Sequence, residues 1–129
     1  MFHKPSNSLA TTLFIKTKGD FTYSPDRKKD KWKIHKEKGA FSGDCDDFAL
    51  TFAYRLFNKS FWLPLLLGKF EIYQVDYNSI GHMVVLYNKV WYDNIMRLPT
   101  EVGFLPYNYG NFKKLNPFVM FVNYFFWKH

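Results

Sequence analysis

Residues 42–57 constrain the fold of this chain most, because a marked helix start precedes an apolar pattern of helical period. Apolar residues recur every four positions in two adjacent rows, which are Phe48, Phe52 and Leu56, and Ala49, Ala53 and Phe57. Ser42 or Asp44 can cap such a helix by accepting hydrogen bonds from its first N–H groups. The pattern predicts a helix from about Cys45 to Phe57, with an apolar side that must pack on another layer.

Cys45 is the only cysteine in the chain, so an internal disulfide is excluded. Three carboxylates within four residues (Asp44, Asp46 and Asp47) argue against an apolar interior around it. In the first turn of a helix, unpaired N–H groups and the positive end of the dipole favour a thiolate. We therefore predict that Cys45 is a nucleophile. The alternative is a cysteine that only packs.

His82 is the best candidate for the base that such a nucleophile needs. Of the four histidines, His3 and His129 lie at the termini, and we expect His35 to lie in a solvated, lysine-rich loop. His82 instead opens a continuous apolar run, residues 82–87, which is typical of a strand. On its own, a histidine at this position is more often a structural residue at the end of a strand, and the functional interpretation depends on Asp93.

A hairpin is predicted next, because Asn88 and Lys89 separate this strand from a second one at residues 90–95. With the turn centred there, Tyr87 pairs with Val90, Val84 with Asp93, and His82 with Ile95. Side chains alternate along a strand, so Asp93 falls on the face of His82, diagonal to it. A slip of one residue would move Asp93 to the opposite face. The predicted register thus yields a Cys45-His82-Asp93 triad.

These segments resemble the bacterial transglutaminase-like cysteine proteinases. Residues 43–49, Gly-Asp-Cys-Asp-Asp-Phe-Ala, are similar to the family's GDCED(Y/F)A nucleophile motif. Residues 81–86 resemble its histidine strand, and Asp93-Asn94 its Asp-Asn pair. Upstream, Phe21, Tyr23, Asp26, Asp30, Trp32 and Lys38-Gly39 match the family's lead-in, and Tyr107, Leu115-Asn116 and the aromatic tail loosely resemble its C-terminal strands. The resemblance spans residues 19–95 in order.

The resemblance implies an α+β fold with a papain-like core, in which a catalytic helix packs on a small antiparallel sheet. It also implies thiol proteolysis by Cys45, His82 and Asp93. Some members bind calcium beside the cysteine, which here would involve Asp44 and Asp46. This chain is shorter than typical members, and Asp46 stands where glutamate is usual. Successive helical residues point about 100° apart, so we expect at most two carboxylates to face one ion and calcium to bind weakly or not at all. Asp46 and Asp47 complement the helix dipole equally well.

Length and composition predict a single domain covering residues 1–129. Aromatic residues make up 22% of the chain, so we expect a core built from rings. No secretory leader is evident, and the apolar runs 61–67 and 118–127 are too short to span a bilayer. We expect a soluble protein in the cytoplasm, where Cys45 would stay reduced.

The net charge of +7 is concentrated between residues 26 and 39. This segment carries seven lysines and arginines around Trp32, which could hold phosphates and stack a base. A solvated face of a basic protein is the simpler interpretation. An intermediate interpretation is that this segment attracts an acidic protein substrate toward the active site. A non-catalytic viral or mobile-element module that binds nucleic acid or protein is the alternative to an enzyme.

Further elements follow from local patterns. We expect a short N-terminal element at residues 9–16, an interruption of regular secondary structure at Leu63-Pro64 and a strand at residues 70–77. Pro99, Pro106 and Gly110 predict a long loop over residues 98–114. Alternating apolar residues predict a last strand at 118–126.

The predicted activity is thiol hydrolysis of an amide bond in a protein or peptide. Cys45 attacks the carbonyl, His82 moves the proton, Asp93 orients the imidazole, and the Cys45 N–H donates to the oxyanion. Transglutamination and glutamine deamidation share the acyl-enzyme and remain alternatives. We expect this reaction to need no cofactor, and calcium is the one candidate ligand.

Overall fold

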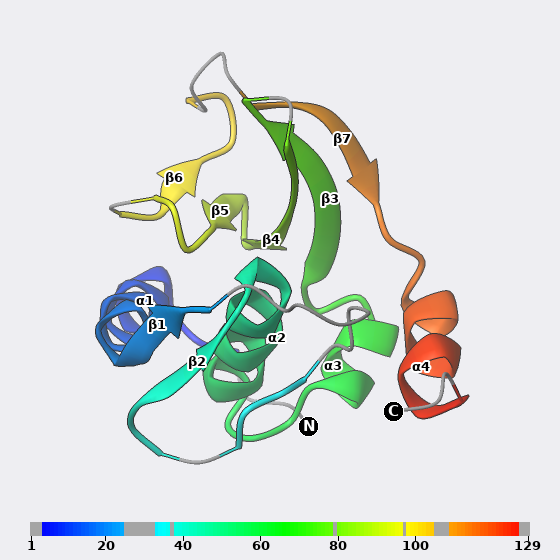
Figure 1. Ribbon diagram of the computed structural model, residues 1–129, viewed down its shortest axis with the longest axis horizontal. Helices are drawn as coiled ribbons and strands as arrows, with labels where there is room; N and C mark the ends of the chain where they lie inside the picture. The colour runs from blue at the N-terminus through cyan, green and yellow to red at the C-terminus, as the bar shows by residue number, and fades with distance from the viewer. Residues whose placement is uncertain are drawn as a thin grey trace.

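The computed structural model describes residues 4–24, 33–36, 38–78, 80–96, 98–104 and 109–126, the side chain of residue 80 excepted. The elements in chain order are α1 (Asn7–Asp20), β1 (Phe21–Tyr23), β2 (Phe41–Gly43), α2 (Cys45–Leu56), α3 (Trp62–Leu66), β3 (Glu71–Tyr77), β4 (Ile80–Tyr87), β5 (Val90–Tyr92), β6 (Thr100–Glu101), β7 (Tyr109–Lys114) and α4 (Pro117–Phe126). Figure 1 shows helices below and a curved sheet above. Helices and a small antiparallel sheet agree with the predicted α+β class.

The main sheet has five strands in the order β6-β5-β4-β3-β7, and each neighbouring pair is antiparallel. Helix α2 packs against the central strand β4, and α1 packs against α2. A separate parallel pair, β1 with β2, leads the chain into α2. The start of α2 is therefore held between a short ribbon and the middle of the sheet.

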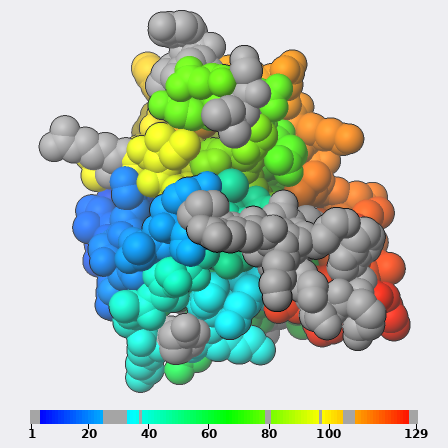
Figure 2. Space-filling view, viewed as in Figure 1, coloured from blue at the N-terminus to red at the C-terminus, as the bar shows by residue number. Residues whose placement is uncertain are grey.

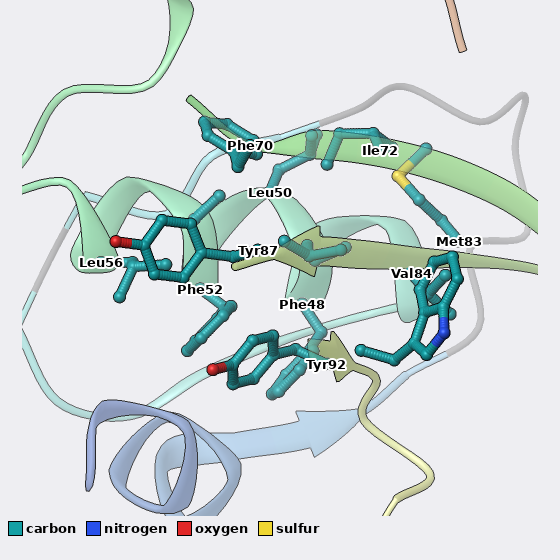
Figure 3. Close-up of a cluster of buried hydrophobic side chains, with 14 of the residues drawn as sticks. Phe48, Leu50, Phe52, Leu56, Phe70, Ile72, Met83, Val84, Tyr87 and Tyr92 are labelled. Atoms are coloured by element: carbon teal, nitrogen blue, oxygen red, sulfur yellow. The ribbon is translucent and has the colours of Figure 1, made fainter. Parts of the chain in front are cut away.

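Aromatic rings fill the layer between α2 and the sheet (Figure 3). Phe48, Phe52 and Leu56 are buried as their spacing predicts. The Phe52 ring stacks on the Tyr92 ring of β5, with centroids 4.8 Å apart. The Tyr87 ring of β4 meets Phe57 edge-on at 5.4 Å. Such pairs each contribute about 0.5–1.5 kcal/mol beyond the burial of their area, so the predicted ring-built core is confirmed.

The predicted hairpin is also confirmed. Asn88 and Lys89 both have positive φ, 52° and 66°, as a two-residue type I′ turn requires. Tyr87 pairs with Val90, and the ladder continues to Val85 and Tyr92. β5 ends there, earlier than predicted, because the chain turns at Asp93, whose carbonyl accepts from Met96 N at 3.0 Å. Val84–Asp93 and His82–Ile95 are therefore not ladder pairs.

The C-terminal strand prediction is wrong, because residues 117–126 form helix α4. The Asn116 side chain caps this helix by accepting from Phe118 N at 2.8 Å and Val119 N at 3.2 Å. Pro117 occupies the first helical position, where its missing N–H costs nothing. Rings at helical spacing, Phe121, Tyr124 and Phe125, pack on Trp62 of α3. The Asn116-Pro117 pair is a helix-start signal in the sequence, and it outweighs the alternation of apolar residues that predicted a strand.

Three other segments differ from prediction. The N-terminal element is longer, because the Ser6 side chain accepts from Leu9 N and caps a helix that continues to Asp20. Pro64 does not interrupt regular secondary structure. It lies in the short helix α3, near its start, where proline is tolerated. The described parts of the predicted 98–114 loop contain strands β6 and β7. The predicted strand at 70–77 is confirmed as β3.

His35 is buried, so its assignment to a solvated loop is wrong. Its backbone N–H donates to the Thr51 hydroxyl at 3.0 Å, and its ring packs on Phe41 with centroids 5.1 Å apart. The hydrogen bond holds His35 against α2, and the ring contact packs it on β2. Residues 25–32 and 37, in and next to the basic segment 26–39, lie outside the described residues. Within the described ranges, no helix combines the length and apolarity needed to cross a membrane.

Candidate active site

Cys45 is the first residue of α2, as predicted. Asp44 caps the helix, and its Oδ1 accepts from Asp46 N at 3.1 Å and Asp47 N at 3.2 Å. Gly43 is required here, because a Cβ at this position would lie 2.2 Å from Asp47 Oδ2. The Asp47 carboxylate in turn accepts from Lys33 N and contacts His35 Nε2, both at 3.3 Å. The acidic residues around the cysteine thus build the start of the helix.

The Cys45 thiol is half-buried and donates to Asp46 Oδ1 at 3.4 Å. Burial and the adjacent Asp46 carboxylate raise the pKa of Cys45 to about 12, against a smaller lowering by the backbone of Met83 on β4. The helix dipole alone would favour a thiolate, but desolvation and a neighbouring negative charge outweigh it. The pKa of Cys45 therefore shifts in the direction opposite to the one that the helix start favours, while its predicted role as nucleophile stays a prediction.

His82 and Asp93 are both buried and are hydrogen-bonded to each other through the His82 Nε2 and the Asp93 Oδ1 atoms. The predicted juxtaposition of these two side chains is therefore present, although Asp93 lies just past the end of β5. Tyr109 of β7 donates its hydroxyl to Asp93 Oδ2 at 2.7 Å. A carboxylate that is 1% exposed needs such partners, because a buried unpaired charge is costly. Both Asp93 oxygens are hydrogen-bonded, which fixes the carboxylate and the imidazole together.

Cys45 and His82 line one cavity of about 410 Å³, whose other lining residues are Tyr23, Tyr77, Asn78, Gly81, Asn94 and Ile95. A volume of this size suits a peptide side chain and its adjoining backbone. Among the described residues there is no hydrogen bond between the Cys45 thiol and His82. The structure thus brings His82 and Asp93 into contact and places Cys45 on the same cavity.

Tyr109 and Asn94 are site residues that the sequence did not single out for a role. Tyr109 lay within a predicted loop, and only the β3–β7 pairing, in which it faces Tyr77, carries it to Asp93. Asn94 Oδ1 is buried with no hydrogen-bond partner among the described residues. An unpaired buried acceptor costs about 1–3 kcal/mol. The one sequence feature that pointed to Asn94 was the resemblance of Asp93-Asn94 to the Asp-Asn pair of the family.

The residues predicted to hold calcium, Asp44 and Asp46, are engaged within the chain by the cap and by the thiol. Across the described part of the chain there is no group of three or more histidine, cysteine, aspartate or glutamate side chains arranged to hold a metal. Calcium binding stays a prediction, which thermal melts with calcium and with chelator would test.

Comparison with known proteins gave no significant match to a family model, a curated protein or a solved structure. The resemblance to transglutaminase-like cysteine proteinases therefore rests on the sequence motifs alone.

Proposed function

We propose that this protein is a thiol hydrolase with a papain-like core that cleaves an amide bond in a protein or peptide. The observation that carries the proposal is the buried His82–Asp93 pair on a cavity that Cys45 also lines. A histidine held by a carboxylate and placed beside a cysteine is the arrangement that nucleophilic catalysis needs. A cysteine serving only as packing would require neither of these buried polar residues.

In the proposed reaction, His82 takes the proton of Cys45 as the sulfur attacks the carbonyl carbon. His82 Nε2 is bonded to Asp93, so Nδ1 is the nitrogen that accepts this proton. The raised pKa of Cys45 favours a proton transfer that accompanies the attack over one that precedes it. His82 then protonates the leaving amine, and a water molecule, deprotonated by His82, hydrolyses the thioester and restores the thiol.

The Cys45 N–H is the proposed oxyanion donor. The Asp44 cap uses the N–H groups of Asp46 and Asp47, so it does not compete for the N–H of Cys45. The positive end of the α2 dipole adds to this stabilisation. Asn94 Oδ1 is the proposed acceptor for a substrate N–H, since a bound peptide would give this buried oxygen a partner.

The test compares wild type with Cys45→Ser on a mixture of peptides, with products identified by mass spectrometry. We expect the serine variant to fold normally and to lose turnover, because the hydroxyl is a much weaker nucleophile here. Retention of wild-type activity by the serine variant would contradict a thiol mechanism. An added primary amine separates the alternatives: its incorporation indicates transglutamination, conversion of glutamine to glutamate indicates deamidation, and shortened peptides indicate proteolysis.

A further inference from the structure

A second cavity, of about 490 Å³, lies toward the C-terminal end of α2, which begins at Cys45. Its lining residues come from α1, from the segment before β2, and from the last turn of α2 and the turn after it: Leu13, Lys16, Lys36, Lys38, Gly39, Tyr54, Arg55, Asn58 and Lys59. A helix rises 1.5 Å per residue, so Arg55 is roughly 15 Å along the axis from Cys45. In Figure 2, the blue residues of α1 border the cyan residues that precede α2. The two cavities share no lining residue.

Positive charge dominates this second cavity. Five of its nine described lining residues are lysine or arginine, and none is acidic. Asp20 pairs with two of them, Lys16 Nζ at 3.2 Å and Arg55 Nη1 at 2.8 Å. One carboxylate is thus shared by two cations. Lys36, Lys38 and Lys59 are exposed and form no ion pair among the described residues.

Arg55 is held in place before any ligand arrives. Its Nη2 donates to the Gly39 carbonyl at 2.9 Å, and its guanidinium lies 5.1 Å from the centre of the Phe41 ring. The side chain is only 14% exposed. A fixed guanidinium loses little conformational entropy when it binds an anion. The exposed lysines around it can then contact the remaining charge of the ligand.

The position at the end of α2 does not by itself account for these cations. The negative end of a helix dipole favours basic residues in its last turn, which explains Arg55. It does not require Lys16 from α1, or Lys36 and Lys38 from the segment before β2. Like charges that converge from three segments repel one another. An anionic ligand would relieve that repulsion.

We propose that this cavity binds a small molecule that carries two or more adjacent phosphate groups. The excess positive charge matches more than one phosphate, and lysine and arginine are the side chains that bind phosphate. The volume lies within the range of small-molecule sites. A nucleic acid strand would instead need a groove that follows its backbone. Leu13 and Tyr54 supply apolar contacts for the body of a nucleotide, and inorganic polyphosphate is the other source of the same chemistry.

Titration calorimetry with tripolyphosphate at low salt tests this proposal. The variant Lys36→Gln/Lys38→Gln/Lys59→Gln should lose at least tenfold in affinity. The control Lys69→Gln/Lys89→Gln/Lys113→Gln removes the same charge from exposed lysines that do not line the cavity, and should lose less than threefold. Thermal melts establish that each variant is folded. A parallel titration with ATP identifies the source, since tighter binding than tripolyphosphate indicates a nucleotide and equal or weaker binding indicates inorganic polyphosphate.

Three results would overturn the proposal. These are no heat of binding with the wild-type chain, equal losses in the two triple variants, and tighter binding of a 20-nucleotide single strand than of either small probe. Equal losses would show that diffuse surface charge attracts the anion. Cys45→Ser should bind tripolyphosphate like wild type, so the outcome here is independent of the proposed hydrolase activity.

Discussion

The reactivity of Cys45 should rise when the neighbouring carboxylate is neutralised in Asp46→Asn. The thiol sulfur and Asp46 Oδ1 are 3.4 Å apart, so a thiolate there would face a full negative charge. At that separation the repulsion is about 1 kcal/mol in water and about 5 kcal/mol at an effective dielectric constant of 20. Since one pKa unit corresponds to about 1.4 kcal/mol, these energies span roughly 1 to 3.5 pKa units. Burial is the larger cause of the raised pKa and remains in the variant, so the substitution should lower the pKa of Cys45 by roughly 1 to 2 units.

The expected gain in labelling rate is smaller than the gain in thiolate. Well below the pKa, the thiolate fraction rises about tenfold for each unit by which the pKa falls. Intrinsic nucleophilicity falls at the same time, with a Brønsted coefficient of about 0.4–0.5. The net gain is roughly three- to fourfold per unit, or about 3- to 16-fold in all. In wild type the rate should keep rising with pH toward about 12, without a plateau near the ordinary thiol value.

Iodoacetamide labelling followed by intact mass spectrometry measures these rates, because the chain has a single thiol. Glu101→Gln is the matched control: it also removes one negative charge, from an exposed residue of β6 that does not line the Cys45 cavity. Equal labelling rates in Asp46→Asn and Glu101→Gln would refute the electrostatic argument. A wild-type rate that levels off near pH 8 would refute the raised pKa itself.

Two further substitutions, followed by urea unfolding, test the residues that support the site. Gly43→Ala should destabilise the fold by about 1–3 kcal/mol, because its Cβ would overlap Asp47. The control Gly19→Ala lies in a helix with open space around it and should be neutral or stabilise by up to about 1 kcal/mol, so equal effects of the two substitutions would contradict the crowding argument. Tyr109→Phe removes the hydroxyl that donates to Asp93 at 2.7 Å and should cost about 1–3 kcal/mol together with much of any amide hydrolysis, so unchanged stability and turnover would show that this hydroxyl does not support the carboxylate.

Local patterns were sufficient to predict the helix and the hairpin that carry the candidate site. The four-residue spacing of apolar side chains predicted α2, and the capping residues predicted that Cys45 lies in its first turn. The Asn88-Lys89 turn predicted the pairing of β4 with β5, which extends from Tyr87–Val90 to Val85–Tyr92, and Asp93 follows directly after its end. These features depend on contacts between residues that are close in the chain, which is why the sequence shows them. The Asn116-Pro117 helix start was equally local, and the apolar alternation after it obscured the signal.

What the sequence determined by itself is thus the helix, the hairpin and the side chains available for chemistry. Tertiary structure decided how those side chains behave. Only the packing of α2 on β4 shows that burial and Asp46 together raise the pKa of Cys45. Only strand pairing carries Tyr109 to Asp93, 16 residues away in the chain. Burial, charge proximity and long-range contacts depend on how distant segments meet in space, and no local pattern encodes them.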